Sequence, residues 1–275
     1  MSELVSYCNK KSDVKEAENP LPTIKNGRLV YDIDAFHYEN EETLADIHFA
    51  LEQGQTLGLV GQTGSGKTTL IRLLLREYDL QEGQITLDGH DIREYRLADL
   101  RRLIGYVPQD QFFICDEYFR KYFVLEIRKA LLAQVEAAAK LARVYDDIVA
   151  MPDGFETVIG EKGVSLSGGQ KQRIAMSRAM ILESDILILD DSLSAVDAKT
   201  EHAIIENLKE TRQNKSTIIT AHRLSAVVHA DLILVLQDGH IIEHGRHEEL
   251  IEQGGWYADT YEAQQLEMEG DADEE

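Results

Sequence analysis

Apolar and polar residues alternate in short stretches from Leu29 to Leu59, the first part of the chain with a regular pattern. A period of two is typical of strands that bury one face. Polar breaks at residues 39–41 and 53–54 separate the stretches. We therefore expect short antiparallel strands, with apolar positions at Val30, Ile33, Phe36, Leu44, Ile47, Phe49 and Leu51.

A different order begins at residues 57–60, where an unbroken apolar run leads into a glycine-rich loop and then into the dense apolar stretch 69–75. Strand, loop and helix in this order open an α/β unit. Unbroken apolar strands are typical of a parallel sheet that is covered on both faces. The sequence therefore predicts an α/β fold. Its later elements are expected as strands at 186–189, 216–220 and 232–236, a helix at 200–208 and a two-strand turn at Asp238–Gly239.

The two ends of the chain show neither period. Residues 1–25 are polar, include Pro20 and Pro22, and are expected to form a linker or frayed arm. The other end, from Glu262 onward, carries many acidic residues and no basic one, so residues 263–275 are expected to be a disordered acidic tail. One folded domain is thus expected over residues 26–262.

Charge and composition narrow the possible partners. The 275 residues include 28 Lys and Arg against 50 Asp and Glu, a formal net charge of -22. A field of this sign repels nucleic acid and anionic lipid surfaces. Cys8 and Cys115 stand far apart, which predicts no disulfide framework, and no apolar run approaches the roughly 18 residues that span a bilayer. Residues 1–11 do not resemble a secretion signal, so the cytosol is the expected compartment.

The glycine-rich loop at residues 61–68 follows the pattern G-x-x-x-x-G-K-[ST] between an expected strand and an expected helix. Glycines in this pattern let backbone N–H groups curl around phosphates, while Lys67 supplies a cation and the Thr68 hydroxyl can bind Mg²⁺. A glycine turn that merely caps a helix is the plain alternative. The expected nucleotide-binding residues are Gly61, Gln62, Thr63, Gly64, Ser65, Gly66, Lys67, Thr68 and Thr69.

Two further segments add to this site. The apolar strand 186–189 ends in Asp190, a carboxylate placed to hold Mg²⁺ through water, although such a strand can also be only a strand and a turn. Residues Leu166–Gln170 place a serine and two glycines before a helix, which predicts a second anion site at its N-terminus, or a simple serine cap. One domain does not need two phosphate cradles, so the second is expected to face a nucleotide held by another copy.

With these motifs the chain resembles the nucleotide-binding domain of ATP-binding cassette (ABC) transporters of the exporter type, over nearly all of residues 27–263. The resemblance implies a P-loop NTPase core with a mostly parallel sheet, an N-terminal antiparallel β subdomain and a helical subdomain at about 110–178. It also implies ATP and Mg²⁺ as the cofactors. Within the motif Leu166–Gln170, the family's signature, it implies nucleotide contacts by Ser167, Gly168, Gly169 and Gln170.

The resemblance assigns roles to single residues as well. Tyr38 matches the aromatic that stacks on adenine, although a strand tyrosine can serve packing alone. Gln109 matches the residue that touches Mg²⁺ and the attacking water, and His222 matches the switch histidine at the γ-phosphate, with an ordinary strand-end histidine as the alternative. Residues 157–163 resemble the exporter-specific loop, and residues 194–197 resemble the loop that crosses the dimer interface.

The chain departs from the family directly after Asp190. The family has Glu there, as the general base or water-orienting group, and this chain has Asp191. The aspartate carboxylate falls about 1 to 1.5 Å short of the water, and a misplacement of about 1 Å can lower a rate about 100-fold. We therefore predict slow hydrolysis with Asp191, His222 and Gln109 as catalytic residues and Thr68, Gln109 and Asp190 at the metal. The alternative is that Asp in place of Glu is tolerated because a shift of the backbone restores the reach of the carboxylate.

A second departure covers residues 112–134, where the family's aromatic-rich pattern is missing. The genetic code allows codons for these residues that would spell the family pattern if they were read in a shifted frame. The segment is therefore either frame-shifted or a divergent helix of the helical subdomain, and the codons of the gene decide between the two.

The expected partners follow from the resemblance. They are a second nucleotide-binding domain, expected to carry the catalytic Glu in a heterodimer like that of multidrug exporters with one degenerate half, and the transmembrane domain of an exporter. The expected location is the cytoplasm at the inner face of the cell membrane, with no nucleic acid bound. A non-catalytic ATP-binding subunit and a soluble ABC ATPase outside transport are the alternatives, and the transported substrate is not encoded in this chain.

Overall fold

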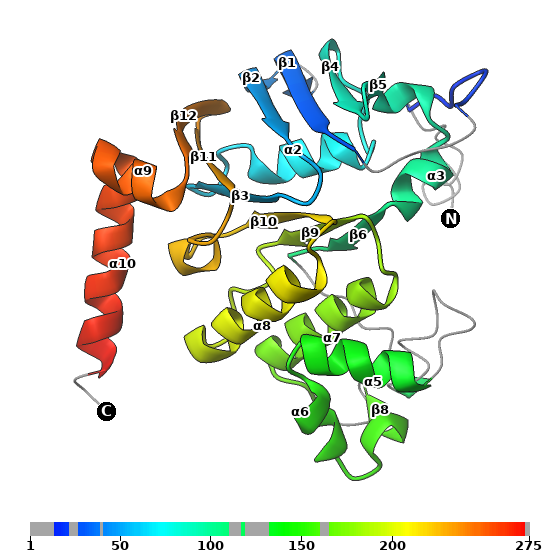
Figure 1. Cartoon of the computed structure of the whole chain (residues 1–275), viewed down its shortest axis with the longest axis vertical. Coiled ribbons are helices and arrows are strands. Elements are labelled where there is room, and N and C mark those ends of the chain that lie inside the picture. The colour runs from blue at the N-terminus through cyan, green and yellow to red at the C-terminus, as the bar shows by residue number, and fades with distance from the viewer. Residues whose placement is uncertain are drawn as a thin grey trace, which may run out of the picture.

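The computed structural model describes residues 14–21, 27–38, 41–109, 117–118, 132–159 and 165–272. An antiparallel sheet forms one end of the molecule, a second and larger sheet crosses its middle, and helices occupy the other end (Figure 1). Most of the segment 112–134 and residues 160–163 of the expected exporter loop lie outside the described residues.

The smaller sheet confirms the antiparallel strands expected near the start of the domain. Its strand order is β2-β1-β4-β5, and every neighbouring pair is antiparallel. Side chains alternate across it as the period of two requires, with Leu29, Tyr31 and Ile33 buried. The strands are β1 (Leu29–Tyr38), β2 (Glu41–Leu51), β4 (Glu82–Leu87) and β5 (His90–Asp91).

The larger sheet confirms the predicted parallel arrangement. Its order is β12-β11-β3-β10-β9-β6, parallel from β11 to β6, with β12 antiparallel at the edge. Strands β9 and β10 are buried along their full length, because helices and the other sheet cover them. The strands are β3 (Thr56–Gly61), β6 (Ile104–Val107), β9 (Ile186–Asp190), β10 (Ser216–Thr220), β11 (Leu232–Gln237) and β12 (His240–Gly245).

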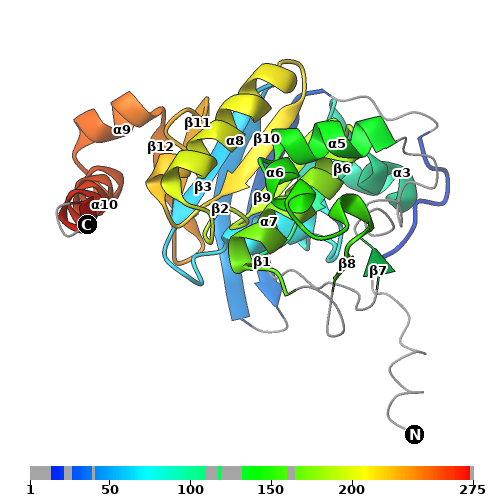
Figure 2. The same cartoon turned by 90° about the horizontal axis from the view of Figure 1, so that it is seen from below.

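Helices cover both faces of the larger sheet. Helix α2 (Lys67–Leu74) lies between the two sheets, while α5, α7 and α8 lie beyond the larger sheet, as the view from below shows (Figure 2). None of the described helices combines the length and the apolar character needed to cross a membrane. The remaining elements are η1 (Ile92–Glu94), α3 (Leu97–Arg102), β7 (Glu117–Tyr118), α5 (Leu132–Leu141), α6 (Tyr145–Val149), η2 (Gly154–Glu156), β8 (Val158–Ile159), α7 (Gly168–Ile181), α8 (Ala198–Thr211) and η3 (Leu224–Ala226).

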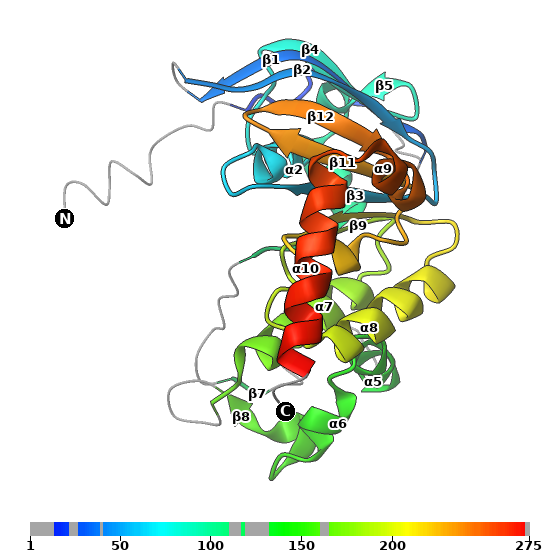
Figure 3. The same cartoon turned by 90° about the vertical axis from the view of Figure 1, so that its left-hand side faces the viewer.

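The C-terminal end corrects one expectation. After α9 (His247–Gln253), helix α10 (Trp256–Ala272) runs as one element along the side of the molecule that carries β11 and β12 (Figures 1 and 3). Residues 263–272 are therefore helical, and the prediction of a disordered tail from residue 263 is wrong. Tertiary contacts made by the first half of α10 anchor the helix, so the acidic composition that suggested disorder does not decide the structure.

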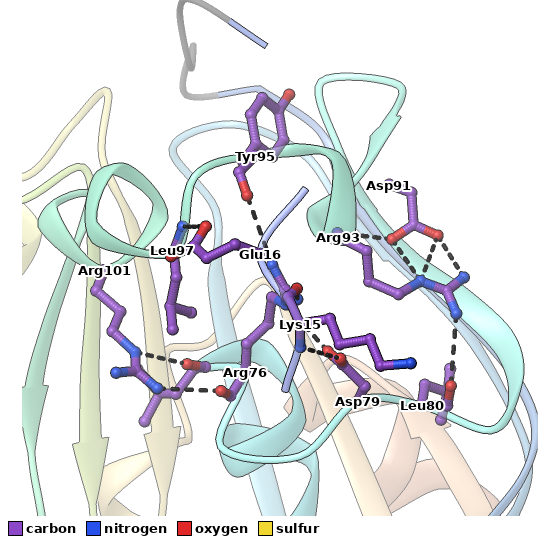
Figure 4. A network of polar contacts seen from close by, with 11 residues as sticks. Lys15, Glu16, Arg76, Asp79, Leu80, Asp91, Arg93, Tyr95, Leu97 and Arg101 are labelled. Carbon is purple, nitrogen blue, oxygen red and sulfur yellow. Dashed lines mark hydrogen bonds and ion pairs between the residues drawn. The ribbon is translucent and has the colours of Figure 1, made fainter. Parts of the chain in front are cut away.

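The N-terminal end corrects a second expectation, because residues 14–21 lie against the domain instead of forming a frayed arm. Figure 4 shows the contacts. The Arg76 guanidinium, only 1% exposed, donates to the Lys15 carbonyl at 2.7 Å, and the Lys15 N–H donates to Asp79 Oδ2 at 3.3 Å. The Glu16 carboxylate accepts the Leu97 N–H at 3.2 Å. A pattern search misses such docking because the segment supplies mainly backbone groups.

Candidate nucleotide site

The glycine-rich loop joins β3 to α2 in the geometry that its composition predicts. Gly61, Gly64 and Gly66 have φ values of 138°, 83° and 107°, which residues with a Cβ rarely adopt. A Cβ on Gly66 would lie 2.6 Å from Leu44 Cδ2. Gly66 is also the N-cap of α2 and makes no side-chain cap, so the first N–H groups of the helix remain open to a ligand.

Lys67 lies within this loop with its ammonium group turned toward backbone oxygens. Its Nζ donates to the carbonyls of Gly61 at 2.8 Å and Gln62 at 2.9 Å. Burial lowers the pKa of Lys67, while the nearby Asp191 and Asp190 carboxylates act in the opposite direction. The cation is therefore held at the loop between backbone acceptors and two carboxylates.

Asp190 ends β9 and is the most densely hydrogen-bonded carboxylate of the site. Its Oδ1 accepts the Thr220 hydroxyl at 2.7 Å and the Thr68 hydroxyl at 3.4 Å, and its Oδ2 accepts the Tyr106 hydroxyl at 3.1 Å. The sheet explains this arrangement, because β9 lies between β6 and β10 and Asp190 pairs in register with Thr220. Burial, reinforced by Asp190, raises the pKa of Tyr106, so its hydroxyl stays a donor.

Asp191 adopts a left-handed backbone conformation, with φ 46°, and both of its backbone groups are held. Its N–H donates to Thr220 Oγ1 at 2.8 Å, and its carbonyl accepts the Ser194 hydroxyl at 2.9 Å. Its Oδ2 accepts the Gln109 side-chain N–H at 3.1 Å. Burial, with a smaller contribution from Asp190, raises the pKa of Asp191 against the opposing effects of His222 and Lys67.

These groups share one cavity of about 310 Å³. It brings together most of the residues that the sequence singled out for nucleotide binding and chemistry. Gly61 and Gln62 do not line it, although their carbonyls hold the Lys67 ammonium. The lining residues are Tyr38, Thr63, Gly64, Ser65, Gly66, Lys67, Thr68, Thr69, Arg72, Gln109, Asp190, Asp191, Thr220 and His222.

Tyr38 lies at the rim of this cavity in an aromatic cluster. Its ring makes edge contacts with Phe36 and Tyr78, each at 4.9 Å between centroids. Tyr78 is 41% exposed. Packing and access to the cavity therefore coexist at Tyr38, so the two alternatives considered for this residue do not exclude each other.

The residues Ser167–Gln170 do not line this cavity. Ser167 caps α7 through its hydroxyl, which accepts the Gln170 N–H at 3.2 Å, and the Gln170 side chain accepts the Ser167 N–H at 3.0 Å. Ser167 and Gly168 are exposed, while Gly169 packs against the loop 194–197, where an added Cβ would lie 2.7 Å from the Ala195 carbonyl. This motif therefore lies at the surface, apart from the phosphate loop of its own chain.

Three residues of the site were missed by the sequence reasoning. Arg72 lines the cavity one helical turn after Thr68, so the i, i+4 spacing on α2 was a usable signal. Tyr106 and Thr220 donate to Asp190 from the strands on either side of β9. Their contacts depend on the strand order, which the sequence pattern alone does not supply.

The donor set fits Mg²⁺ together with a phosphorylated ligand. The side-chain oxygens of Thr68, Gln109 and Asp190 are the hard donors that Mg²⁺ prefers, and Mg²⁺ usually adds substrate phosphates to one or two carboxylates. No group of three or more His, Cys, Asp or Glu side chains that could hold a metal occurs among the described residues. The ion would thus need ligand oxygens to complete its shell, next to a loop whose open N–H groups and Lys67 suit phosphate.

Comparison with known proteins agrees with this geometry. The chain is 47% identical over 268 residues to the probable multidrug resistance ABC transporter ATP-binding/permease protein YheI of Bacillus subtilis, covering 97% of this chain and 45% of that protein. It is 43% identical to the multidrug resistance-like ATP-binding protein MdlA of Escherichia coli, covering 92% and 43%. It is 41% identical to the human ATP-binding cassette sub-family B member 6, covering 99% and 32%.

A solved structure agrees as well. The structure of a bacterial Atm1-family ABC exporter with ATP bound superposes with a TM-score of 0.89 at 35% identity, covering 96% of this chain and 47% of that one. The chain spans less than half the length of these relatives. The profile of the ABC transporter family matches residues 44–194, more than half of the chain. This chain therefore belongs to the ABC transporter family.

Proposed function

We propose that this chain binds Mg-ATP, dimerises around it, hydrolyses it slowly and powers an exporter. The observation that carries the proposal is the single cavity in which the phosphate loop, Asp190, Asp191, Gln109 and His222 meet. Lys67 and the open N–H groups of α2 would hold the phosphates. Thr68, Gln109 and Asp190 would hold Mg²⁺, which neutralises phosphate charge when bound.

Within this proposal Asp191 orients the attacking water or accepts its proton. Its raised pKa suits proton acceptance, and its bond from Gln109 directs one carboxylate oxygen. The hydrogen bonds to Thr220 and Ser194 hold both backbone groups of Asp191, which argues against a backbone shift that would replace the missing methylene of a Glu. Slow turnover is the expected consequence.

The second half of the proposal concerns the partner. Ser167 and Gly168 are exposed and lie outside the cavity of their own chain, which supports a role in completing a nucleotide site on another subunit. The preferred partner is a nucleotide-binding domain with Glu at the position of Asp191, as in a heterodimeric exporter with one degenerate half. A catalytically silent subunit that binds ATP and lends Ser167 is the nearest alternative.

Export is proposed from the relatives. YheI and MdlA carry multidrug resistance in their names, and the matched solved structure is an exporter. We place the chain in the cytoplasm at the inner face of the membrane, attached to a transmembrane domain. A soluble ABC ATPase acting on nucleic acid fits less well. Where basic residues gather, around a cavity of about 290 Å³, Arg212 and Lys215 donate to backbone carbonyls instead of presenting free charge.

The test compares Mg-ATP turnover by the chain and by Asp191→Glu, with ATP affinity measured separately. We expect equal affinity and a rate at least about tenfold higher for Asp191→Glu, because the longer side chain restores the reach of the carboxylate. Asp191→Asn is the matched control. It keeps the length of the side chain but cannot accept a proton, so it should be slower than the parent chain.

The outcomes separate the parts of the proposal. Equal rates for the parent chain and Asp191→Glu contradict the assignment of slow turnover to Asp191. ATP binding without turnover in either protein favours the silent subunit, or a requirement for a partner's signature residues. Adding a partner domain that carries the Glu distinguishes these two, because only the second predicts that turnover then appears.

A further inference from the structure

Helix α10 contacts the loop that carries His222, residues 221–224, which we call the switch loop, and the first turns of α10 are firmly held. The Glu243 carboxylate of β12 accepts the N–H groups of Trp256 at 2.5 Å and Tyr257 at 3.1 Å. Tyr257 is fully buried, and its hydroxyl lies 2.9 Å from His247 Nδ1. Three held groups at one end fix the direction in which the rest of α10 extends.

Gln264 lies on the same face of α10 as its anchors. Tyr257, Tyr261 and Gln264 occupy positions i, i+4 and i+7, which share one side of a helix. The Tyr261 ring makes an edge contact with His247 at 4.8 Å between centroids and packs against the core, so this face points toward the domain. The Gln264 side chain therefore projects from an anchored surface, not from a free helix end.

The Gln264 amide makes two hydrogen bonds to the backbone around His222. Its Nε2 donates to the His222 carbonyl at 2.8 Å, and its Oε1 accepts the Leu224 N–H at 2.9 Å. Leu224 begins η3, so its N–H has no partner within that short helix. One side chain thus holds the residues on both sides of Arg223 and caps η3 from another element.

The loop held in this way is the one that carries the imidazole into the phosphate cavity. His222 lines that cavity together with Lys67 and Asp191. Beyond it, the loop is tied to the segment 194–197, where Arg223 Nη1 donates to the Val196 carbonyl at 2.9 Å. The switch loop is therefore held by α10 through its backbone and by the segment 194–197 through the Arg223 side chain.

The two hydrogen bonds of Gln264, here called the Gln264 clamp, lie next to open space. A cavity of about 380 Å³ separates the end of α10 from the switch loop and the start of α8. Beside this cavity, the Gln264 amide joins α10 to the switch loop by its two hydrogen bonds. The lining residues are Asp197, Ala198, Arg223, Ser225, Gln264, Gln265 and Glu267.

We infer that Gln264 is a positioning residue for His222, so that α10 controls ATP hydrolysis through the backbone of the switch loop. The inference rests on the proposed ATP hydrolysis. Loss of the amide should let the loop relax into the neighbouring cavity and displace the imidazole. Groups that bind ATP, such as Lys67 and Thr68, lie on α2 and should keep their positions, so the rate should fall without a loss of affinity.

The experiment uses the full chain with Asp191→Glu as the parent and adds either Gln264→Ala or the control Gln265→Ala. Gln265 lines the same cavity from the next position of α10. For Gln264→Ala we expect unchanged ATP affinity and single-turnover hydrolysis slowed about tenfold. We also expect hydrogen exchange at the Leu224 amide to speed up about tenfold, as the loss of one hydrogen bond implies. Gln265→Ala should match the parent in all three.

Equal hydrolysis in the two variants would overturn the inference, and so would unchanged exchange at Leu224. A parent that binds ATP but does not hydrolyse it favours instead the silent subunit or the requirement for a partner's signature residues. The inference is then judged by NMR of the His222 imidazole, whose resonance should shift on adding Mg-ATP in Gln265→Ala and not in Gln264→Ala. A shift of equal size in both variants would refute the positioning role.

Discussion

Helices α2 and α7 each begin at a glycine-rich motif, but their first turns are built differently. At α2 the N-cap is Gly66 without a side-chain cap, and Lys67 lies beside open N–H groups in the cavity. At α7 the N-cap Ser167 forms a capping box with Gln170 and faces the surface. This difference supports the proposal that α2 binds phosphate within one chain, whereas α7 contacts a nucleotide held by another subunit.

The largest expected effect tests the α2 side of this comparison. Lys67→Ala removes the cation and its charged hydrogen bonds, which should weaken ATP binding by the single chain about 100-fold. Isothermal titration with Mg-ATP measures the change. Lys171→Ala, in the first turn of α7, is the matched control and should leave the affinity unchanged. An equal loss of ATP affinity in both variants would contradict the proposal that the single chain binds ATP at α2 and not at α7.

A pair of glycines provides the next test. Gly66 has φ 107° and no room for a Cβ beside Leu44, so Gly66→Ala should lower the free energy of unfolding by about 2 kcal/mol and weaken ATP binding. Gly168 has an ordinary φ, and an added Cβ would lie 3.5 Å from Ala195 Cβ. Gly168→Ala should therefore shift stability by less than about 0.5 kcal/mol.

Urea unfolding of both glycine variants, with titration of Mg-ATP into each, measures these effects. A large loss of stability in Gly168→Ala would contradict the open geometry at the start of α7. Unchanged stability in Gly66→Ala would contradict the strain assigned to the phosphate loop.

The nucleotide site shows which features could be predicted from the sequence and which could not. The phosphate loop and the end of β9 were predictable, because glycine spacing and buried apolar runs are local features that depend on few distant contacts. Tyr106 and Thr220 were not, since their bonds to Asp190 exist only when β9 lies between β6 and β10. The role of a residue that reaches the site across the sheet is set by strand order, which local patterns leave open.

The predictions for the two chain ends were wrong for a related reason. Polar composition suggested a frayed arm and a disordered tail, but residues 14–21 dock through backbone groups on the buried Arg76. Helix α10 is anchored by Tyr257 and by the caps from Glu243. Neither anchor has a periodic signature. The Gln264 clamp was missed as well, because an amide in an acidic segment resembles any solvent-exposed helix position.

A smaller effect tests the cap of α7. Ser167→Ala removes the hydroxyl that accepts the Gln170 N–H, which should lower the free energy of unfolding by about 1 kcal/mol. The affinity of the single chain for Mg-ATP should not change, because Ser167 does not line its cavity. Ser167→Thr retains a capping hydroxyl and should recover most of the stability. Weaker ATP binding by monomeric Ser167→Ala would contradict the separation of the two sites.

The smallest effect concerns Glu201 of α8, which is 2% exposed. Glu201 follows the segment 194–197, against which Gly169 of α7 packs. Its Oε1 accepts the Ser225 hydroxyl at 2.6 Å, while burial raises the pKa of Glu201 despite that bond and the nearby Arg223. The folded state therefore disfavours the ionised form. At pH values below the ordinary glutamate pKa both states are protonated, and the folded state bears no cost.

As the pH rises through the ordinary glutamate value, the unfolded chain ionises first and the folded chain loses stability relative to it, until the raised pKa is passed. Glu201→Gln should remove this loss, so it should be more stable than the parent at pH 8 and equal to it at pH 4. Thermal unfolding at both pH values measures the difference. Glu210→Gln, on the exposed face of the same helix, should show no such pH dependence. A constant offset between Glu201→Gln and the parent at both pH values would show that the substitution changes packing and not the cost of a buried charge.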